Sequence, residues 1–483
     1  MDTSHRSVRT GTMLVQATAI VFLLTAFYLV PDGASPLVLW PALVLFYIYF
    51  LLAIRRPIRI HSAIPTFVTI EVLFLIFYYI LFLFPYQLHL LGLADLSRSA
   101  FVSRTFVEES NRAVIAAALG LIAFCLGIRP VRTARGGGQS VSPENPQAYR
   151  YLGVVSLLVL VGLIALYQLA GWRSSGEGRY TGTTTGGSLA EGVSLLIQVF
   201  CMIAIALATS RVVQRRRISL SIWLALALTG YWAVRILMLG DRNAFLLIAI
   251  AAVGGLLTFC VKAGRGALAL CVLIALLLYN AVEVARMSEN VSLDTIVAAL
   301  TGNGDQARGD ESSFNITTVT LRASLEAVPD HHGFSYGLYK LIGVAGIVPL
   351  IRGFVIGQGE QFTSTADILA LHVLGEHATW GVGTNIISDI YIDFSIFGVP
   401  ALMFLTGRFA AAITRHAMNN PGSVMPVTLY LMTLALFAEL PRYSIDFPVR
   451  FLTWTVILFA LYRVFFGTRG FSPRARPARS GAL

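Results

Sequence analysis

The sequence predicts an all-α membrane protein that crosses the bilayer many times, and its composition is the first observation behind that prediction. Of 483 residues, 56% are hydrophobic and 13% are charged, and the mean hydropathy is +0.73. An ordinary soluble domain carries about 25% charged residues. This composition excludes a soluble enzyme, a disordered chain and a nucleic-acid-binding protein.

The length of the apolar runs is the second observation. A helix needs roughly 20 apolar residues to cross a bilayer, and twelve runs approach that length. They lie near residues 11–30, 37–54, 63–84, 111–128, 150–170, 189–210, 219–239, 244–261, 266–282, 389–414, 424–440 and 447–466. Each run predicts one transmembrane helix. The first run is too long for a cleavable signal, and no small-x-small site precedes Pro31.

The distribution of the 36 Lys and Arg residues is the third observation. With the amino terminus inside, the cytoplasmic segments are the two chain ends and the loops 55–59, 129–150, 211–217, 262–265 and 408–415. These short segments hold most of the basic residues, as the positive-inside rule requires. We therefore expect twelve spans with both termini in the cytoplasm.

The predicted spans divide the chain into four parts. Residues 1–282 hold spans one to nine, 283–388 form a large extracytoplasmic loop, 389–466 hold the last three spans, and 467–483 are a basic tail. Within the loop, 336–351 is apolar, but Lys340 and Pro349 interrupt it. A crossing there would put the arginines of the tail outside, so a re-entrant or interfacial helix is expected.

Few charged groups lie inside the predicted spans. Glu71 is the one clear mid-span charge, and it is either functional or a carboxylic acid hydrogen-bonded to a neighbouring helix. The four cysteines, Cys125, Cys201, Cys260 and Cys271, lie in apolar runs and predict small buried hydrophobes rather than disulfides or a zinc site. The chemistry is therefore expected at the external ends of the spans and in the loop.

Outward-facing arginines form the first group of candidate site residues, because they oppose the orientation rule. Arg235 and Arg242 flank the outer end of span seven, Arg286 follows span nine, and Arg442 and Arg450 lie in or near the last external turn. A guanidinium matches phosphate oxygens bidentately, so this group suits a diphosphate at headgroup depth. Snorkelling of the side chains or pairing with nearby carboxylates is the alternative.

Histidines and carboxylates form the second group. Asp330, His331 and His332 are consecutive between a Pro and a Gly, which indicates either an acid/base loop or a surface turn. His377 precedes span ten. Two adjacent histidines with one Asp lack the ligand spacing of a zinc site, so no metal is predicted. Asp389 and Asp393 follow, one helical turn apart at the mouth of span ten. They could activate a hydroxyl, or merely start a helix.

Three passages carry a resemblance to a known family. Gly240-Asp241-Arg242, the stretch Thr320-Leu321-Arg322, and the passage from Asp389-Ile-Tyr391-Ile-Asp393 to Gly398 resemble the Wzy-type O-antigen or oligosaccharide repeat-unit polymerases. Ten residues separate Arg322 from Gly333, which looks like one copy of an arginine-ten-residues-glycine pattern of that family. The resemblance implies a GT-C-like glycosyltransferase of the bacterial inner membrane with a large periplasmic loop.

The resemblance also implies a reaction and its partners. A growing glycan would leave its undecaprenyl-diphosphate carrier and join a hydroxyl of an incoming lipid-linked repeat unit, with a separate co-polymerase regulating chain length. No cofactor is implied, because the diphosphate-sugar bond supplies the energy, and no phosphate-binding Gly-rich loop is seen. An O-antigen ligase and a lipid-oligosaccharide flippase are the alternatives.

The candidate residues divide into two roles. The catalytic candidates are His331, His332, His377, Asp389 and Asp393. The candidates for binding diphosphate or glycan are Arg235, Arg242, Arg286, Arg322, Arg442 and Arg450.

Overall fold

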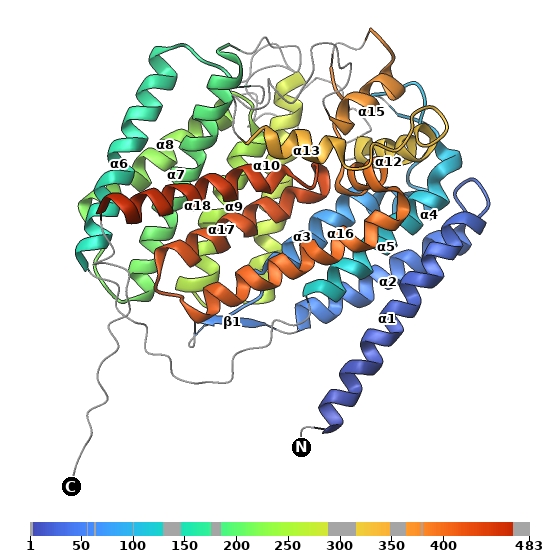
Figure 1. The fold of residues 1–483 in the computed structure, drawn as a ribbon, viewed down its shortest axis with the longest axis horizontal. Helices are drawn as coiled ribbons and strands as arrows, with labels where there is room; N and C mark the ends of the chain where they lie inside the picture. Colours follow the sequence, from blue (N-terminus) through green and yellow to red (C-terminus); the bar gives the residue numbers. More distant parts are fainter. Residues whose placement is uncertain are drawn as a thin grey trace.

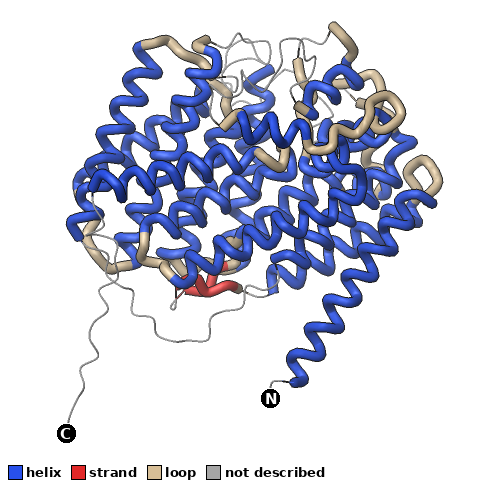
Figure 2. Tube along the Cα trace, in the orientation of Figure 1, coloured by secondary structure: helices blue, strands red, loops and turns tan. Residues whose placement is uncertain are grey.

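The chain folds into an all-α bundle with one small β-hairpin, as a computed structural model shows (Figures 1 and 2). The structure describes residues 3–55, 57–61, 64–99, 101–128, 146–174, 185–287, 315–347, 364–377 and 380–466. The fold class predicted from the sequence, an all-α polytopic membrane protein, is confirmed.

The elements follow one another in two groups. The first group is α1 (Thr3–Leu29), α2 (Pro36–Arg55), β1 (Ile58–His61), β2 (Ile64–Thr66), α3 (Ile70–Phe82), α4 (Phe84–Leu90), η1 (Val107–Glu109), α5 (Ser110–Ile128), α6 (Pro146–Leu169), α7 (Gly187–Val213), α8 (Leu220–Met238), α9 (Arg242–Gly255), η2 (Leu256–Cys260) and α10 (Arg265–Met287). The second is α12 (Asn315–Ala327), α13 (Leu338–Ala345), α15 (Thr365–Leu374), α16 (Ile386–Asn419), α17 (Val424–Glu439), η3 (Leu440–Arg442) and α18 (Phe447–Phe466).

Each of the twelve apolar runs overlaps one or two of these helices. Among the described residues, nine helices are long and apolar enough to cross a membrane, and the pair α3 and α4 makes a tenth if it is one broken span with a 49° bend. α13 has eight residues, which is too short to cross. The total of twelve crossings and the boundaries of the large loop stay predictions.

The run 63–84 differs from its predicted form. Its first residues form β2, which pairs antiparallel with β1, and α3 begins only at Ile70. Thr69 caps this helix, since its Oγ1 accepts a hydrogen bond from the Val72 amide at 3.1 Å. Glu71 therefore lies in the first turn of α3 rather than in mid-span. The helix dipole favours a negative charge in the first turn.

The centre of the bundle is the contact between α5 and α16. Gly127 and Gly407 face each other there, and a Cβ on either one would overlap a backbone carbonyl of the other helix. Membrane helices approach this closely only at small residues. This contact holds α16, whose first turns carry Asp389 and Asp393, against α5.

Contacts between loops show which helix ends lie together. The Arg265 guanidinium donates to the Ile54 carbonyl at 3.2 Å, so the start of α10 lies beside the end of α2, near the hairpin. Gln214 donates to the Gly422 carbonyl at 2.7 Å, which joins the α7–α8 and α16–α17 turns. In each pair, both segments were predicted to lie on the cytoplasmic side of the membrane. α12, α13 and α15 lie away from the hairpin, in the upper part of Figure 1.

Candidate functional site

A buried polar network fixes the start of α16. Asn385 caps the helix: its Oδ1 accepts from the Ser388 amide at 2.9 Å, and its Nδ2 donates to Ser388 Oγ at 2.7 Å and to Thr320 Oγ1 at 3.1 Å. Ser324 Oγ on α12 donates to Ser388 Oγ at 3.0 Å. These bonds tie the first turn of α16 to α12 and so determine where Asp389 lies.

A break in α16 brings a second segment over the same turn. Ser395 has φ 61° and ψ −177°, which interrupts the helix just after Asp393. The Ile392 carbonyl accepts a hydrogen bond from the Ser335 amide at 3.1 Å. Gly337, with φ +88°, then begins α13, and a Cβ there would lie 2.9 Å from the Phe394 ring. The segment leading into α13 is thereby held against the break.

Lys340 on α13 joins the two carboxylates of α16. Its Nζ lies 2.5 Å from Asp389 Oδ1 and 3.1 Å from Asp393 Oδ2. The side chains are 16%, 1% and 0% exposed, respectively. Burial lowers the pKa of Lys340, but the attraction of Asp389 and Asp393 outweighs burial and raises it above its ordinary value. Lys340 therefore stays protonated at neutral pH, where its charge offsets the negative charges of Asp389 and Asp393.

Asp389 holds four elements together. Besides Lys340, its Oδ1 accepts from Thr365 Oγ1 at 2.7 Å, and its Oδ2 accepts from the Ile445 amide at 2.8 Å. These contacts join α13, α15 and the turn before α18 to α16. With donors on both oxygens, the carboxylate suits positioning better than proton transfer.

A polar cavity of about 430 Å³ opens on this cluster. Its polar and charged lining consists of Asn243, Thr317, Tyr339, Lys340, Ser364, Thr365, Thr384, Asp389, Arg442, Tyr443, Ser444, Asp446 and Arg450. The apolar residues and glycines of the lining come from α12, α13 and α15 and from residues 381–383. We call this space the polar cavity.

Asp446 is the second carboxylate of the polar cavity. A Cβ on Gly343 would overlap its carboxylate, so α13 packs directly on it. Burial raises the pKa of Asp446 above its ordinary value, and the Asp389 charge raises it further, while Lys340 opposes both. Asp446 therefore takes up a proton more readily than an exposed aspartate, which suits a proton acceptor.

Comparison with known proteins decides the family. A family model described as O-antigen polysaccharide polymerase Wzy matches residues 12–469. This chain belongs to the Wzy family of O-antigen polysaccharide polymerases. No curated protein and no solved structure matches it. The matched range contains every residue of the polar cavity, so the cavity lies wholly within the part of the chain that the family model covers.

Two of the predicted arginines line the polar cavity of this Wzy protein. Arg442 and Arg450 are both in its wall, and Arg442 Nη1 donates to Asn243 Oδ1 at 3.5 Å. Arg242, the residue before Asn243, is only 2% exposed and lies behind the wall. Buried Glu439 interacts electrostatically with both Arg242 and Arg442. The arginines of α9 and η3 are thus brought to one place.

The other predicted arginines are not brought to the cavity. Arg235 stacks on the Trp232 ring, with its Cζ 4.9 Å from the centroid, and on Tyr167 at 5.3 Å. Arg322 is buried, and it donates to the Thr318 carbonyl at 3.4 Å and to Ser110 Oγ at 3.5 Å. The side chain of Arg286 lies outside the described residues.

The predicted histidines also lie apart from the Wzy cavity, and one of them, His331, lies beside His372, which was not among the candidates. His331 and His372 approach Glu326 Oε1 at 4.0 and 3.6 Å, and Arg104 Nη1 pairs with the same oxygen at 2.6 Å. We call Arg104, Glu326, His331 and His372 the histidine cluster. Burial lowers the pKa of His372, an effect that Glu326 opposes.

The other two predicted histidines, His332 and His377, do not line the polar cavity either. His332 follows His331, whereas His377 is exposed in the turn after α15. Among the described residues, no group of three His, Cys, Asp or Glu side chains is arranged to hold a metal ion.

Lys340, Thr365 and Asp446 line the cavity but were not predicted as site residues from the sequence. The lone lysine in the apolar run 336–351 was a signal, because a buried ammonium needs carboxylate partners, and Asp389 and Asp393 were already in view. Nothing in the sequence marks Thr365, whose role depends on how α15 packs against α16.

Proposed function

We propose that this Wzy protein polymerises undecaprenyl-diphosphate-linked oligosaccharide repeat units in the polar cavity. One observation carries the proposal: three cationic side chains, Lys340, Arg442 and Arg450, share a single cavity with the carboxylates Asp389 and Asp446. Cations suit a diphosphate leaving group, and a carboxylate suits an acceptor hydroxyl. Wzy membership supports repeat-unit polymerisation.

The proposed reaction transfers a glycan between two lipid carriers. The bond between the anomeric carbon of the growing chain and its diphosphate oxygen breaks, and its electron pair leaves with undecaprenyl diphosphate. The oxygen of an acceptor hydroxyl on the incoming repeat unit forms the new glycosidic bond. The proton of that hydroxyl passes to a carboxylate of the protein.

Arg442 and Arg450 hold the diphosphate in this proposal. Their guanidinium groups remain charged at any physiological pH and bind phosphate oxygens bidentately. Negative charge accumulates on the leaving diphosphate as the sugar departs, so fixed cations stabilise the transition state more than the ground state. Arg242 is buried beside Asn243, and its positive charge would help to stabilise the diphosphate without lining the cavity.

Asp446 accepts the acceptor proton in this proposal, and Lys340 is a positioning residue. Asp446 lines the cavity, and its raised pKa suits a general base. Lys340 is held by Asp389 and Asp393, so it supplies a fixed charge near Asp446. The histidines, predicted as bases from the sequence, do not line the polar cavity.

The polar cavity faces the periplasm in the proposed topology. The hairpin end of the bundle carries the basic segments near Arg55 and Arg265, which the positive-inside rule assigns to the cytoplasm. α12, α13 and α15 lie away from it, in the upper part of Figure 1. Both termini would then be cytoplasmic, and the lipid-linked units would be used on the outer side of the inner membrane.

The test is reconstitution of polymerisation. Protein purified in detergent receives its lipid-diphosphate-linked repeat unit without nucleotide sugar, and the products are separated on a gel. A ladder of oligomers supports the proposal, and adding a co-polymerase is expected to narrow its length range. Transfer only to an added lipid A core would make the protein a ligase, and movement of the lipid-linked unit across vesicles without transfer would make it a flippase.

A further inference from the structure

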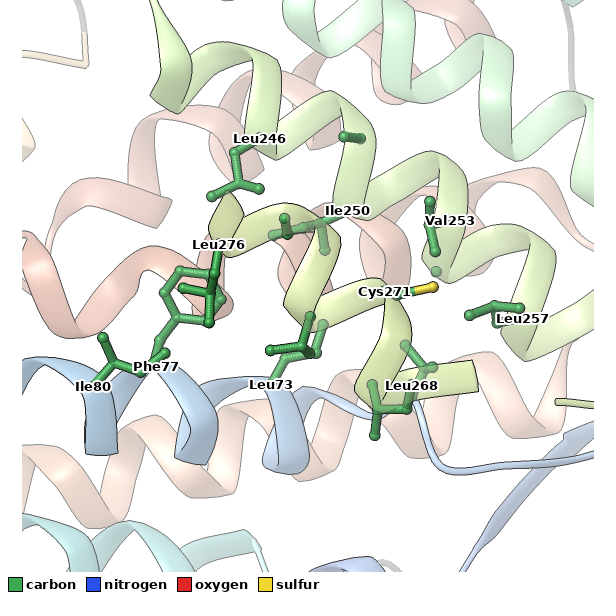
Figure 3. A pocket seen from close by; sticks show the side chains of 15 residues that line it. Leu73, Phe77, Ile80, Leu246, Ile250, Val253, Leu257, Leu268, Cys271 and Leu276 are labelled. Carbon is green, nitrogen blue, oxygen red and sulfur yellow. The ribbon is translucent and has the colours of Figure 1, made fainter. Parts of the chain in front are cut away.

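A second cavity, wholly apolar, lies between α3, α9 and α10. Its volume is about 110 Å³, and none of its lining side chains is charged or hydrogen-bonding apart from the Cys271 thiol. Figure 3 shows Leu73, Phe77 and Ile80 of α3 on one side, with α9 and α10 facing them. We call this space the apolar groove.

One face of α9 connects the two cavities. Asn243 lines the polar cavity, and Leu246, Ile250 and Val253 of the same helix line the apolar groove. These positions are spaced by three and four residues, so they form a single stripe along the helix. Val253 is ten residues beyond Asn243, so the stripe rises about 15 Å along α9 at 1.5 Å per residue. A ligand lying along it would have a polar end at Asn243 and Arg442 and a long apolar remainder.

The groove is distinct from the outer surface of α10. Leu268, Cys271, Val272, Ala275 and Leu276 face the groove, whereas Leu270, Leu273, Ile274 and Leu277 are about half exposed on the other side. In Figure 3 the Cys271 side chain points toward Val253 and Leu257. Between Leu268 and Leu277 the helix is thus apolar all round, with one face turned to the interior and one to the bilayer.

We infer that the apolar groove seats the prenyl tail of the lipid-diphosphate substrate, with the diphosphate at Arg442 and Asn243. This inference rests on the proposed function and adds the tail site to it. The bilayer is as apolar as the groove, so seating the tail gains little from the hydrophobic effect. The groove acts by orientation: a tail held along α9 delivers its diphosphate to the polar cavity in one direction.

Thiol labelling of the unmodified protein tests the site without any turnover. Cys271 lines the groove and Cys260 does not, although both are partly exposed. The detergent-solubilised protein is treated with N-ethylmaleimide, with and without undecaprenyl diphosphate, and each cysteine is followed by mass spectrometry. Cys271 labelling is expected to slow about tenfold when roughly nine-tenths of the protein is occupied, with Cys260 unchanged.

Three labelling results overturn the inference. They are unchanged labelling of Cys271, equal slowing at Cys260, and equal protection by phosphatidylglycerol at the same concentration. The last result would mean that any bilayer lipid fills the groove. If labelling is slowed as expected but the protein makes no polymer, the tail site stands and the proposed function fails.

A matched pair of variants tests the consequence for turnover. Cys271→Trp fills the groove, and Leu270→Trp places the same ring on the exposed face of α10. Cys271→Trp is expected to lower kcat/KM about tenfold for the full-length carrier and to leave a two-isoprene carrier, too short to reach Cys271, within about twofold. Leu270→Trp should change neither value.

Equal kinetics of the two tryptophan variants on the full-length carrier contradict the inference. A misfolded Cys271→Trp protein would lose both carriers together, and Cys271→Leu then repeats the comparison with a smaller side chain. A loss confined to the long carrier supports the groove with either variant.

Discussion

The polar cavity and the histidine cluster lie at opposite ends of the same two helices. α12 contributes Thr317 to the cavity near its start and Glu326 to the histidine cluster near its end. α15 contributes Thr365 at its start and His372 near its end. The two α15 positions are seven residues apart, or about 10 Å along the helix.

The difference between the two regions is how their charges are held. Asp389 is 1% exposed and is fixed by Lys340, Thr365 and the Ile445 amide, whereas Glu326 is 18% exposed and its partners Arg104 and His331 are 60% and 57% exposed. Burying charge in a membrane protein is expensive. By residue type alone, the histidines would be the expected catalysts. Because burying charged groups costs free energy, the buried charges of the polar cavity indicate that this cavity is the functional site.

Removing the carboxylate that ties the cavity together is expected to have the largest effect. Asp389→Asn removes the charge that pairs with Lys340 and weakens the bonds from α15 and the Ile445 amide. The initial rate of repeat-unit consumption should fall at least about 100-fold, because several cavity elements lose their alignment. Exposed Asp95→Asn is the control, and a rate above a third of wild type in Asp389→Asn would break the comparison.

Two arginines that the sequence treats alike are expected to differ. Arg442→Ala should raise KM for the lipid-diphosphate substrate about 10- to 100-fold, the loss typical of a charge-assisted contact. Arg235→Ala removes only stacking on Trp232 and Tyr167, so its KM should stay within about twofold. Steady-state kinetics on both variants measures this difference, and equal KM values would mean that Arg442 does not hold the diphosphate in the polar cavity.

The pH dependence of polymerisation distinguishes a carboxylate base from a histidine base. As the pH falls through the pKa of Asp446, the proton acceptor is lost and kcat/KM should drop about tenfold per pH unit. Because burial and Asp389 raise that pKa, the acid limb should lie above the ordinary aspartate value of about 4. His331→Ala and His372→Ala should leave the limb in place; its disappearance would identify a histidine as the base.

Removal of the histidines is expected to have the smallest effect. The double variant His331→Ala, His372→Ala should keep the polymerisation rate within about threefold, since neither side chain lines the polar cavity. The initial rate of ladder formation measures this. A loss of 100-fold with normal expression and unchanged thermal stability would move catalysis to the histidine cluster.

The helices could be predicted from the sequence because a run of apolar residues has few other ways to satisfy its backbone in a membrane. The run 63–84 is the exception, since local pairing of β1 with β2 delays α3 to Ile70. Asp389, Arg442 and Arg450 were predicted as candidates from charge at the ends of helices, and the cavity contains all three.

The rest of the site depends on contacts between distant segments. Lys340 reaches Asp389 only because α16 breaks at Ser395 and binds the segment before α13 through Ile392 and Ser335. Asp446 comes to the same cavity through the turn before α18. Neither the break nor the docking leaves a pattern in the sequence around these residues.

Site-specific photocrosslinking tests most directly whether the lipid-linked substrate reacts in the polar cavity. A benzophenone amino acid replaces Tyr443 in the cavity wall or His332 beside the histidine cluster, and the protein is irradiated with radiolabelled lipid-diphosphate-linked repeat unit. If the substrate reacts in the polar cavity, position 443 gives labelled protein and position 332 gives only background. Labelling at position 332 with none at position 443 would contradict it.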